Sequence, residues 1–226
     1  MLARIVAAIN PQRGDAMVEI GPGEGALTRP LAQLVDRLEV IEIDRDLAAA
    51  LAKQFAPGRV QVHCADALEF DFSAFPAGVR VAGNLPYNIS TPLLFHLARF
   101  AHRIGDMHFM LQREVVDRMA AAPSTRAYGR LSVSLQARFQ VKKLFNVASG
   151  AFRPAPKVES ALVRLEPRKD GLRIDEDLLR RAFSARRKTL RNALPQADFA
   201  AAGIDPGLRP ENLSPEDYAR LSACVR

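Results

Sequence analysis

The sequence predicts an α/β protein in which a mainly parallel sheet carries helices on both faces and is followed by a small all-helical domain. Short apolar segments alternate with helical patterns through the first 150 residues, which is typical of a doubly wound parallel sheet. A glycine-rich turn and several polar residues directly follow these segments, at the edge where such sheets bind ligands. Beyond Glu166 the pattern changes to short helices separated by glycine and proline.

The first part of the chain is expected to hold five strands and a closing pair. The five strands are short apolar segments at residues 16–20, 38–43, 60–64, 79–82 and 107–111. Helical patterns lie at residues 1–9, 26–35, 46–55, 91–100, 113–121 and 129–139. In the segment 91–100, for example, Leu93, Leu94 and Leu97 recur at helical spacing, which is why a helix is predicted there. Two more strands, at 141–147 and 161–165, form a hairpin-like pair joined by a proline-containing loop at 152–157.

The domain boundary is expected in the polar segment 167–171, which contains Pro167 and Gly171. Residues 1–169 would form the larger domain. Residues 170–226 would form the small helical one, with helices at 176–194, 197–202 and 215–225.

Composition restricts the class of protein. The chain has 226 residues, is 48% hydrophobic and contains no apolar stretch of the roughly 18 residues that a membrane span needs. The N-terminal helix is amphipathic and no cleavage signal follows it. Cys64 and Cys224 lie far apart without metal-ligand spacing, so we expect reduced thiols and no metal site. These features predict a cytoplasmic protein, and we expect a monomer that does not associate with membranes.

The positive charge suggests a polyanionic partner. The formal net charge is +7 and the pI is about 9.9. A predicted helix over 176–194 would place five basic side chains within an arc of roughly 120°, beside an apolar face. They are Arg180, Arg181, Arg187, Lys188 and Arg191. Arg186 would point closer to the apolar side, toward the first domain. The stripe is either an RNA-binding surface or an ordinary solvated face.

The turn after the first predicted strand indicates a cofactor site. Its glycines, Gly21, Gly23 and Gly25, are spaced G-x-G-x-G, whereas a pyrophosphate cradle has G-x-G-x-x-G. Glu19, two residues before the first glycine, would suit a ligand that carries positive charge.

The next two strands end in further acidic residues. Glu42 is placed to accept hydrogen bonds from ribose hydroxyls, although Glu42 or Asp44 could instead only cap the next helix. Asp66, followed by Ala67, could accept from an adenine amino group. One adenosine-containing, cationic ligand fits this set of residues: S-adenosylmethionine.

The segment after the fourth strand, residues 83–91, is expected to hold the substrate. An aromatic amine such as N6 of adenine is a poor nucleophile, because its lone pair is delocalised into the ring. The Asn84 side chain and the Leu85 carbonyl could accept its two hydrogens, and Tyr87 could stack on the base. Pro86 keeps Leu85 extended and has no N–H of its own. The alternative is an ordinary turn with Ser90 or Thr91 as a helix cap.

These motifs together resemble those of the rRNA adenine N6-dimethyltransferases. The matching segments are Glu19-Ile20-Gly21-Pro22-Gly23, Ile41-Glu42-Ile43-Asp44, Asp66-Ala67 and Asn84-Leu85-Pro86-Tyr87-Asn88-Ile89-Ser90-Thr91. Segments that are similar to the small-subunit (KsgA) branch are Tyr128-Gly129-Arg130-Leu131-Ser132, Phe152 to Ser160, and Phe183 to Asn192. The resemblance extends over nearly the whole chain.

The resemblance implies a Rossmann-like class I methyltransferase. It would use S-adenosylmethionine to dimethylate two adjacent adenosines in the hairpin near the 3′ end of small-subunit (16S) rRNA, during late subunit assembly. Asn84 and Leu85 would orient the amine, and Tyr87 and Phe152 would sandwich the flipped base. The cofactor contacts implied are Gly21, Glu42, Asp66 and Asn84. An upstream Gln-Asn-Phe-Leu-like segment that is usual in the family precedes the first residue of this sequence, so we expect cofactor affinity to be affected.

Three alternatives remain. The branch that confers antibiotic resistance by modifying large-subunit rRNA shares the first domain's motifs but differs in the helical tail. A non-catalytic RNA-binding factor could use the same scaffold, although the intact segment Asn84-Leu85-Pro86-Tyr87 argues against it. A nucleotide-dependent oxidoreductase is disfavoured by the glycine spacing.

Overall fold

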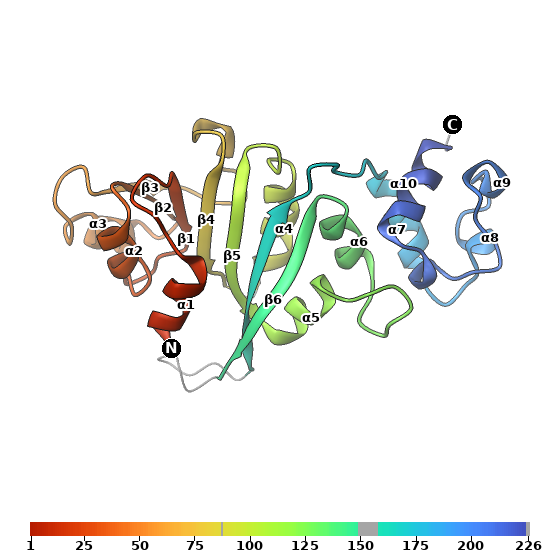
Figure 1. Ribbon diagram of the computed structural model, residues 1–226, viewed down its shortest axis with the longest axis horizontal. Coiled ribbons are helices and arrows are strands. Elements are labelled where there is room, and N and C mark those ends of the chain that lie inside the picture. The colour runs from red at the N-terminus through yellow and green to blue at the C-terminus, as the bar shows by residue number, and fades with distance from the viewer. Residues whose placement is uncertain (87, 149–157, 225–226) are drawn as a thin grey trace. The chain divides into compact units, whose positions relative to one another are not determined.

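A computed structural model describes residues 1–86, 88–148 and 158–224 of the chain (Figure 1). Its centre is a seven-stranded sheet with the strand order β3-β2-β1-β4-β5-β7-β6. The strands are β1 (Met17–Ile20), β2 (Leu38–Glu42), β3 (Val60–Cys64), β4 (Val79–Asn84), β5 (Ile104–Gln112), β6 (Phe139–Val147) and β7 (Ser160–Pro167). The first five pair in parallel and β7 runs antiparallel to β5. The predicted α/β fold is confirmed.

The order of the strands reverses between β1 and β4. In parallel sheets the connections leave opposite faces at such a point and open a crevice beyond the carboxyl ends of the two strands. The glycine-rich turn follows β1, and Asn84 is the last residue of β4. The fold therefore brings the two predicted halves of the site to the same place.

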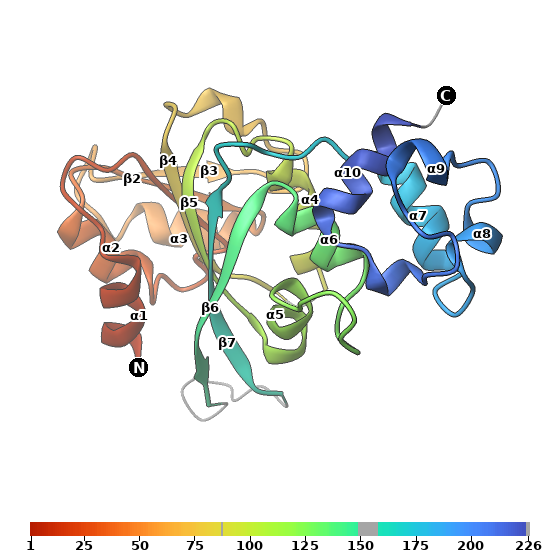
Figure 2. The ribbon, with the colours of Figure 1, turned by 45° about the vertical axis from the view of Figure 1, so that its right-hand side comes forward.

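Helices of different parts of the chain cover the two faces of the sheet (Figures 1 and 2). One face packs against α1 (Leu2–Ile9), α2 (Thr28–Leu34) and α3 (Arg45–Ala52) through an aliphatic core that includes Ile9 and Leu31. An aromatic cluster links η1 (Phe72–Ala74) to α4 (Ser90–Ala98) through contacts of Phe72 with His96 and Phe100. The remaining helices are α5 (Arg113–Met119), α6 (Arg130–Gln136), α7 (Glu176–Ser184), α8 (Leu190–Ala193), α9 (Phe199–Ala202), η3 (Pro210–Asn212) and α10 (Pro215–Ala223).

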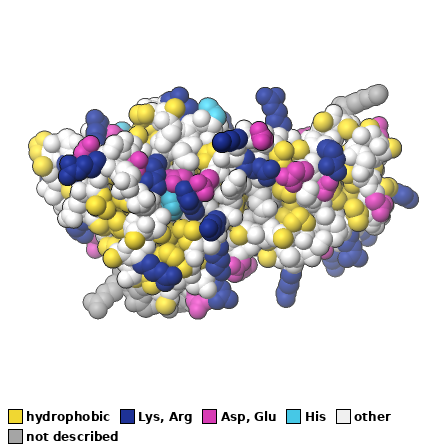
Figure 3. Space-filling view, viewed as in Figure 1, with side chains coloured by type: hydrophobic (Ala, Val, Ile, Leu, Met, Phe, Trp, Pro, Cys, Tyr) yellow, Lys and Arg dark blue, Asp and Glu magenta, His cyan; other side chains and the backbone are white. Residues whose placement is uncertain are grey.

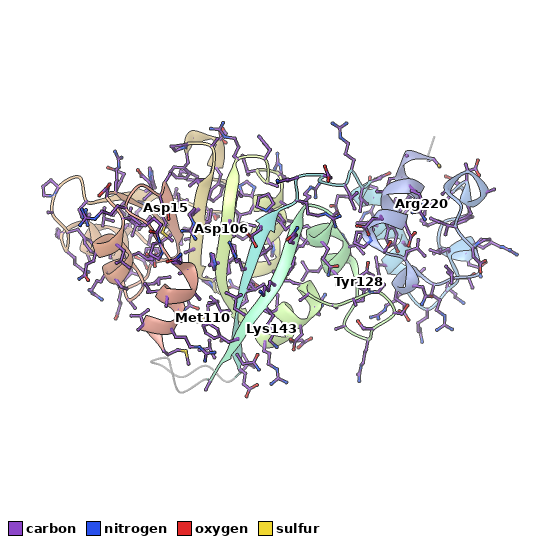
Figure 4. The ribbon with its side chains drawn as sticks, viewed as in Figure 1. Asp15, Asp106, Met110, Tyr128, Lys143 and Arg220 are labelled. Atoms are coloured by element: carbon purple, nitrogen blue, oxygen red, sulfur yellow. The ribbon has the colours of Figure 1, made fainter. Side chains whose placement is uncertain are left out.

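The N-terminal helix α1 is fixed to the sheet by a half-buried arginine. Arg80 on β4 donates to the Ile9 carbonyl at 2.6 Å and to the Asn10 carbonyl at 3.1 Å, which are free because the helix ends there. The same guanidinium pairs with Asp15 at 2.6 Å and, through two nitrogens, with Asp106 at 2.9 and 3.0 Å. Figure 4 labels the two carboxylates. Arg80 therefore satisfies the helix end and two acids at once.

The chain divides into two compact units. Unit 1 comprises Met1–Val116 and Lys142–Pro167, and unit 2 comprises Asp117–Val141 and Arg168–Arg226. The core of unit 2 joins Tyr128 and Val133 to residues of α7 and α10. Residues 117–141 thus contact the C-terminal helices, whereas our division at 169/170 assigned them to the first domain. That division stays a prediction about which segments fold independently.

The prediction of a single helix over 176–194 is wrong. Helix α7 ends at Ser184, and α8 begins only at Leu190. The reason is tertiary: the N–H groups of Leu190 and Arg191 donate to the carbonyls of Leu208 and Pro206, at 2.7 and 3.0 Å, so they are not available to continue the first helix. The 120° arc of basic residues therefore does not exist as predicted.

In the described residues, no helix is both long enough and apolar enough to cross a membrane.

Candidate active site

The glycine-rich turn after β1 needs its glycines. Gly21, Gly23 and Gly25 all have positive φ, between 54° and 83°, where other residues are strained. A methyl group on Gly25 would also lie 2.7 Å from a methyl carbon of Leu51 on α3. The turn is held to the sheet by the Gly21 N–H, which donates to the Ile41 carbonyl at 3.0 Å. A bare backbone is thus exposed to any ligand in the crevice.

Glu42 joins this turn to the end of β2. Its Oε2 accepts from the Gly23 N–H at 3.1 Å and its Oε1 accepts from the Asp44 N–H at 3.0 Å. The cap of α3 is Asp44, whose side chain accepts from the N–H groups of Asp46 and Leu47. The cap expected at Glu42 or Asp44 is thus Asp44 and not Glu42, whose carboxylate faces the glycine turn.

Glu19 lies on β1 with 1% of its surface exposed. Its Oε2 is buried and has no hydrogen-bond partner among the described residues, and the same holds for the Thr28 hydroxyl. Burial raises the pKa of Glu19 to about 8; the Thr28 side chain opposes this shift and the charge of Glu42 adds to it. Strand register places Glu19 beside Ala82, so Glu19, Glu42 and Asn84 are on one face of the sheet.

Asp66 follows β3, at the same edge of the sheet. Its Oδ1 accepts from the Leu68 N–H at 2.8 Å, which fixes a turn, and it is partly exposed. The neighbouring Ala65 N–H donates to the Glu42 carbonyl at 3.0 Å. Ala67 is buried. The loops carrying Glu42 and Asp66 are thus joined by a backbone hydrogen bond.

Asn84, at the end of β4, lies against the glycine turn. A methyl group on Gly21 would be 3.9 Å from both the Asn84 carbonyl oxygen and Pro86 Cδ, which shows how close the two segments are. The approach depends on Gly83, where a Cβ would be 2.5 Å from the Ile20 carbonyl oxygen. The Asn84 side chain is exposed.

Leu85 is fixed by its side chain and its N–H. The side chain is 1% exposed and the N–H donates to the Met110 carbonyl at 3.2 Å. Within the described part of the chain, no N–H donates to the Leu85 carbonyl. Helix α4 begins at Ser90, and its N-cap is Ile89, which makes no side-chain cap. Tyr87 and Phe152 lie outside the described residues.

A family model described as ribosomal RNA adenine dimethylase matches residues 1–225. The chain belongs to this family. Two relatives called ribosomal RNA small subunit methyltransferase A are similar over nearly the whole chain. The protein from Aromatoleum aromaticum is 55% identical over 98% of this chain and 88% of its own, and the one from Thiobacillus denitrificans is 54% identical over 97% and 90%.

Solved structures of the dimethylase family and its neighbours agree with the fold. A dimethyladenosine transferase from Plasmodium falciparum has a TM-score of 0.82 at 26% identity, covering 97% of this chain and 93% of that one. The 23S rRNA methyltransferase ErmE has a TM-score of 0.75 at 24% identity, covering 99% and 96%. The sheet is therefore the Rossmann-like sheet of class I methyltransferases.

One exposed apolar residue beside Glu42 was not among the predicted site residues. Ile43 directly follows Glu42 and is 64% exposed, which is unusual for an isoleucine. It lies between Glu42 and the cap of α3. The sequence could have indicated this residue, because Ile43 is an apolar residue between two acidic ones. We assigned it to the second predicted strand.

The five basic residues predicted to bind RNA lie in unit 2 and are all exposed. Arg180 and Arg181 are on α7, Arg187 and Lys188 are in the connection, and Arg191 is on α8. Figure 3 shows Lys and Arg side chains projecting from this part of the surface. Arg180 pairs with Asp177 at 3.0 Å. Arg186 pairs with Glu211 and donates to the carbonyl of Arg126, which belongs to the predicted first domain (1–169) and to the observed unit 2.

Proposed function

We propose that this protein transfers methyl groups from S-adenosylmethionine to the N6 amines of two adjacent adenosines in the hairpin near the 3′ end of small-subunit (16S) rRNA. The observation that carries the proposal is the contact between the Gly21 turn and the segment from Asn84 to Pro86, in a chain that matches the adenine dimethylase family from end to end. A cofactor site and an acceptor pair for an amine are thereby adjacent.

The residues at the crevice fit S-adenosylmethionine. The glycine turn leaves room that a Cβ would fill, and Glu42 presents a fixed carboxylate to ribose hydroxyls. Asp66 would accept from the adenine amine and Ile43 would pack on the adenine ring. A positive charge nearby, as on the amino group or the sulfonium, would favour the ionised form of Glu19, whose Oε2 is buried and unpartnered among the described residues.

The target adenine would be held at Asn84 and Leu85. The Asn84 side-chain oxygen and the Leu85 carbonyl would each accept one N6 hydrogen, which localises the nitrogen lone pair toward the cofactor. An amine in a paired helix could not reach this point, so the base must be flipped out. We assign the stacking on its two faces to Tyr87 and Phe152.

The chemistry then requires mainly positioning. The bound cofactor supplies an electrophilic methyl group on a good leaving group. Asn84 and Leu85 hold the nitrogen in line with it, and Pro86 keeps the Leu85 carbonyl free of a competing N–H. No strong general base is needed, because the amine becomes acidic only once it is methylated.

The partner is proposed to be an assembling small subunit in the cytoplasm, bound by a monomer. The exposed cations of unit 2 would contact phosphates, because the narrow A-form major groove prevents side chains from reading bases there. The relatives named for the small subunit favour this substrate over large-subunit rRNA.

The proposal is tested by incubating the protein and tritiated S-adenosylmethionine with small subunits that lack the two dimethyladenosines. Label is expected in two adjacent adenosines of the 3′ hairpin, mapped by nuclease digestion and mass spectrometry. Label in large-subunit rRNA instead would favour the other branch. Cofactor binding without transfer to any rRNA would favour a non-catalytic factor.

A further inference from the structure

Unit 2 contains a small cavity between α7 and the segment that follows α8. Its volume is about 290 Å³. Leu178 and Leu194, both buried, form its base, and the half-buried Ala193 and Ala197 line its sides. The rest of the lining is exposed: Pro195 and two polar side chains, Arg181 and Gln196. The cavity is therefore apolar at the base and polar at the rim.

The two rim side chains are available to a ligand. In the described part of the chain, no hydrogen bond or ion pair engages the Arg181 guanidinium or the Gln196 amide, whereas Arg180, the next residue to Arg181, is paired with Asp177. A planar guanidinium can stack on a ring, and a side-chain amide can both donate to and accept from its edge. Together they suit a flat heteroaromatic ring with polar edges.

The surroundings indicate where such a ring comes from. Between Arg180 and Arg191 the chain has six basic residues and no acidic one. Arg180 and Arg186 pair with acidic residues outside this segment, and the other four are exposed, so the adjacent surface attracts a polyanion. The volume is at the small end for ligand pockets, which suits one base rather than a folded segment. Single-stranded RNA is recognised by unstacked bases that stack on aromatic or arginine side chains and are hydrogen-bonded at their edges.

We propose that this cavity binds one unpaired nucleobase of the rRNA substrate, stacked on Arg181 and hydrogen-bonded by Gln196, while the neighbouring cations hold the phosphates on either side. The lining residues of the cavity belong to unit 2, whereas Gly21, Glu42, Asp66 and Asn84 belong to unit 1. The proposal rests on the proposed function, because it takes the polyanion to be the rRNA.

The test measures binding of the full chain to undermethylated small subunits at several salt concentrations. Arg181→Ala is expected to weaken binding about tenfold or more, in the range measured for loss of one stacked base. Arg181→Lys keeps the charge but not the planar group, so its affinity for the subunits should be little higher than that of Arg181→Ala. Ala197→Met fills the cavity without changing charge, and should weaken binding several-fold with an unaltered salt dependence. Gln196→Ala should also weaken binding.

Arg180→Ala is the matched control, since it removes the same charge from the adjacent position outside the cavity. Circular dichroism and S-adenosylmethionine binding check that each variant is folded. If Arg181→Lys binds like the wild type, and Arg181→Ala and Arg180→Ala lose affinity equally, Arg181 is only a phosphate contact and the proposal is overturned.

Chemical probing of the rRNA with dimethyl sulfate provides a second readout. The wild type should protect at least one unpaired base outside the 3′ hairpin, and Arg181→Ala and Ala197→Met should expose that base while Arg180→Ala does not. Protection that is the same in all four proteins would overturn the proposal. Methylation by the wild type is mapped in parallel, so that the two proposals fail separately. If the rRNA is methylated normally but no unpaired base is protected, only the cavity proposal is overturned. If the rRNA is not methylated, the proposed function is overturned as well.

Discussion

At the scale of single residues, the site depends on two glycines on adjacent strands or their ends. Gly83 allows β4 to lie against the Ile20 carbonyl, and Gly21 has a φ of 66°, which a residue with a Cβ adopts only under strain. A side chain at Gly83 would collide with backbone, which cannot move aside as a flexible side chain does. The packing of β4 against β1 and the path of the turn after β1 thus depend on these two glycines.

Asn84→Ala should abolish methyl transfer while leaving RNA binding intact. The change removes the proposed acceptor of the target amine and touches none of the exposed cations of unit 2. Mass spectrometry of the rRNA after incubation with the variant measures dimethyladenosine, and filter binding measures affinity. Unchanged dimethylation would refute the role of Asn84.

Glu19 makes the stability of the protein depend on pH. Its pKa is raised from 4.5 to about 8 in the folded chain. A raised pKa means that the folded state binds the proton more tightly, so this contribution to stability is complete below pH 4.5 and is lost as pH rises to about 8.

The free energy of unfolding of the wild type should therefore decrease by a few kcal/mol across that range, and in Glu19→Gln this decrease should be absent. Urea denaturation of both proteins at pH 5, 6.5 and 8.5 is the measurement. The free energy of unfolding of the variant, relative to that of the wild type, should increase as the pH rises. Parallel curves for the two proteins would show that the carboxyl is ionised at little cost.

At the scale of elements, the sequence predicted strands better than it predicted connections. The third strand was predicted with its observed limits, Val60–Cys64, because alternation is a local pattern. The break after α7 could not be predicted, since it depends on carbonyls of Leu208 and Pro206 that meet Leu190 and Arg191 only in the folded chain. Glu42 and Gly23 were both predicted for the site, but the hydrogen bond between them was not, because it too forms only in the folded chain.

Arg80→Ala should cost about 3–5 kcal/mol of stability, as is usual when a buried ion pair loses one partner. Asp106 would remain buried with only the more distant guanidinium of Arg164, at 3.6 Å, and the last carbonyls of α1 would lose their donor. Urea denaturation measures the total loss, and hydrogen exchange of α1 amides shows whether the helix is released first. The double variant Arg80→Ala, Asp106→Ala should be less destabilised than the sum of the two single variants.

Arg187→Ala combined with Lys188→Ala should weaken RNA binding and lower its salt dependence. Both side chains are exposed on the connection between α7 and α8. Loss of two phosphate contacts would reduce the slope of log affinity against log salt by about 1.5. Lys169→Ala combined with Arg173→Ala removes two exposed charges elsewhere in unit 2 and should have a smaller effect. Equal slopes in the two double variants would assign the connection to the solvated surface.

At the scale of the whole molecule, sequence order and compactness do not coincide. Residues 117–141 are followed by β6 and β7 before the chain returns to unit 2, and no composition change marks their transfer. What holds them there is packing together with hydrogen bonds to the C-terminal segments. In one of these bonds the Tyr128 hydroxyl, buried in the core of unit 2, donates to the Leu213 carbonyl at 2.9 Å. Such a contact over 85 residues has no local signal.

A fragment of residues 1–169 should consequently fold poorly. It would keep Tyr128 and Val133 but lose Leu178, Leu179 and Tyr218, against which they form a core. We expect strong binding of a hydrophobic dye and a lower melting temperature than that of the full chain. A fragment as stable as the unit-1 part of the intact protein would support the division at 169/170.

The bidentate use of Glu42 has a consequence for how the protein selects its ligand. Both oxygens are already anchored by backbone N–H groups, so the side chain loses little conformational freedom when a sugar arrives. Each oxygen keeps a lone pair for one hydroxyl. A 2′-deoxy analogue would leave one of these lone pairs without a donor at a buried carboxylate. The fixed Glu42 carboxylate would therefore favour ribonucleosides over 2′-deoxyribonucleosides.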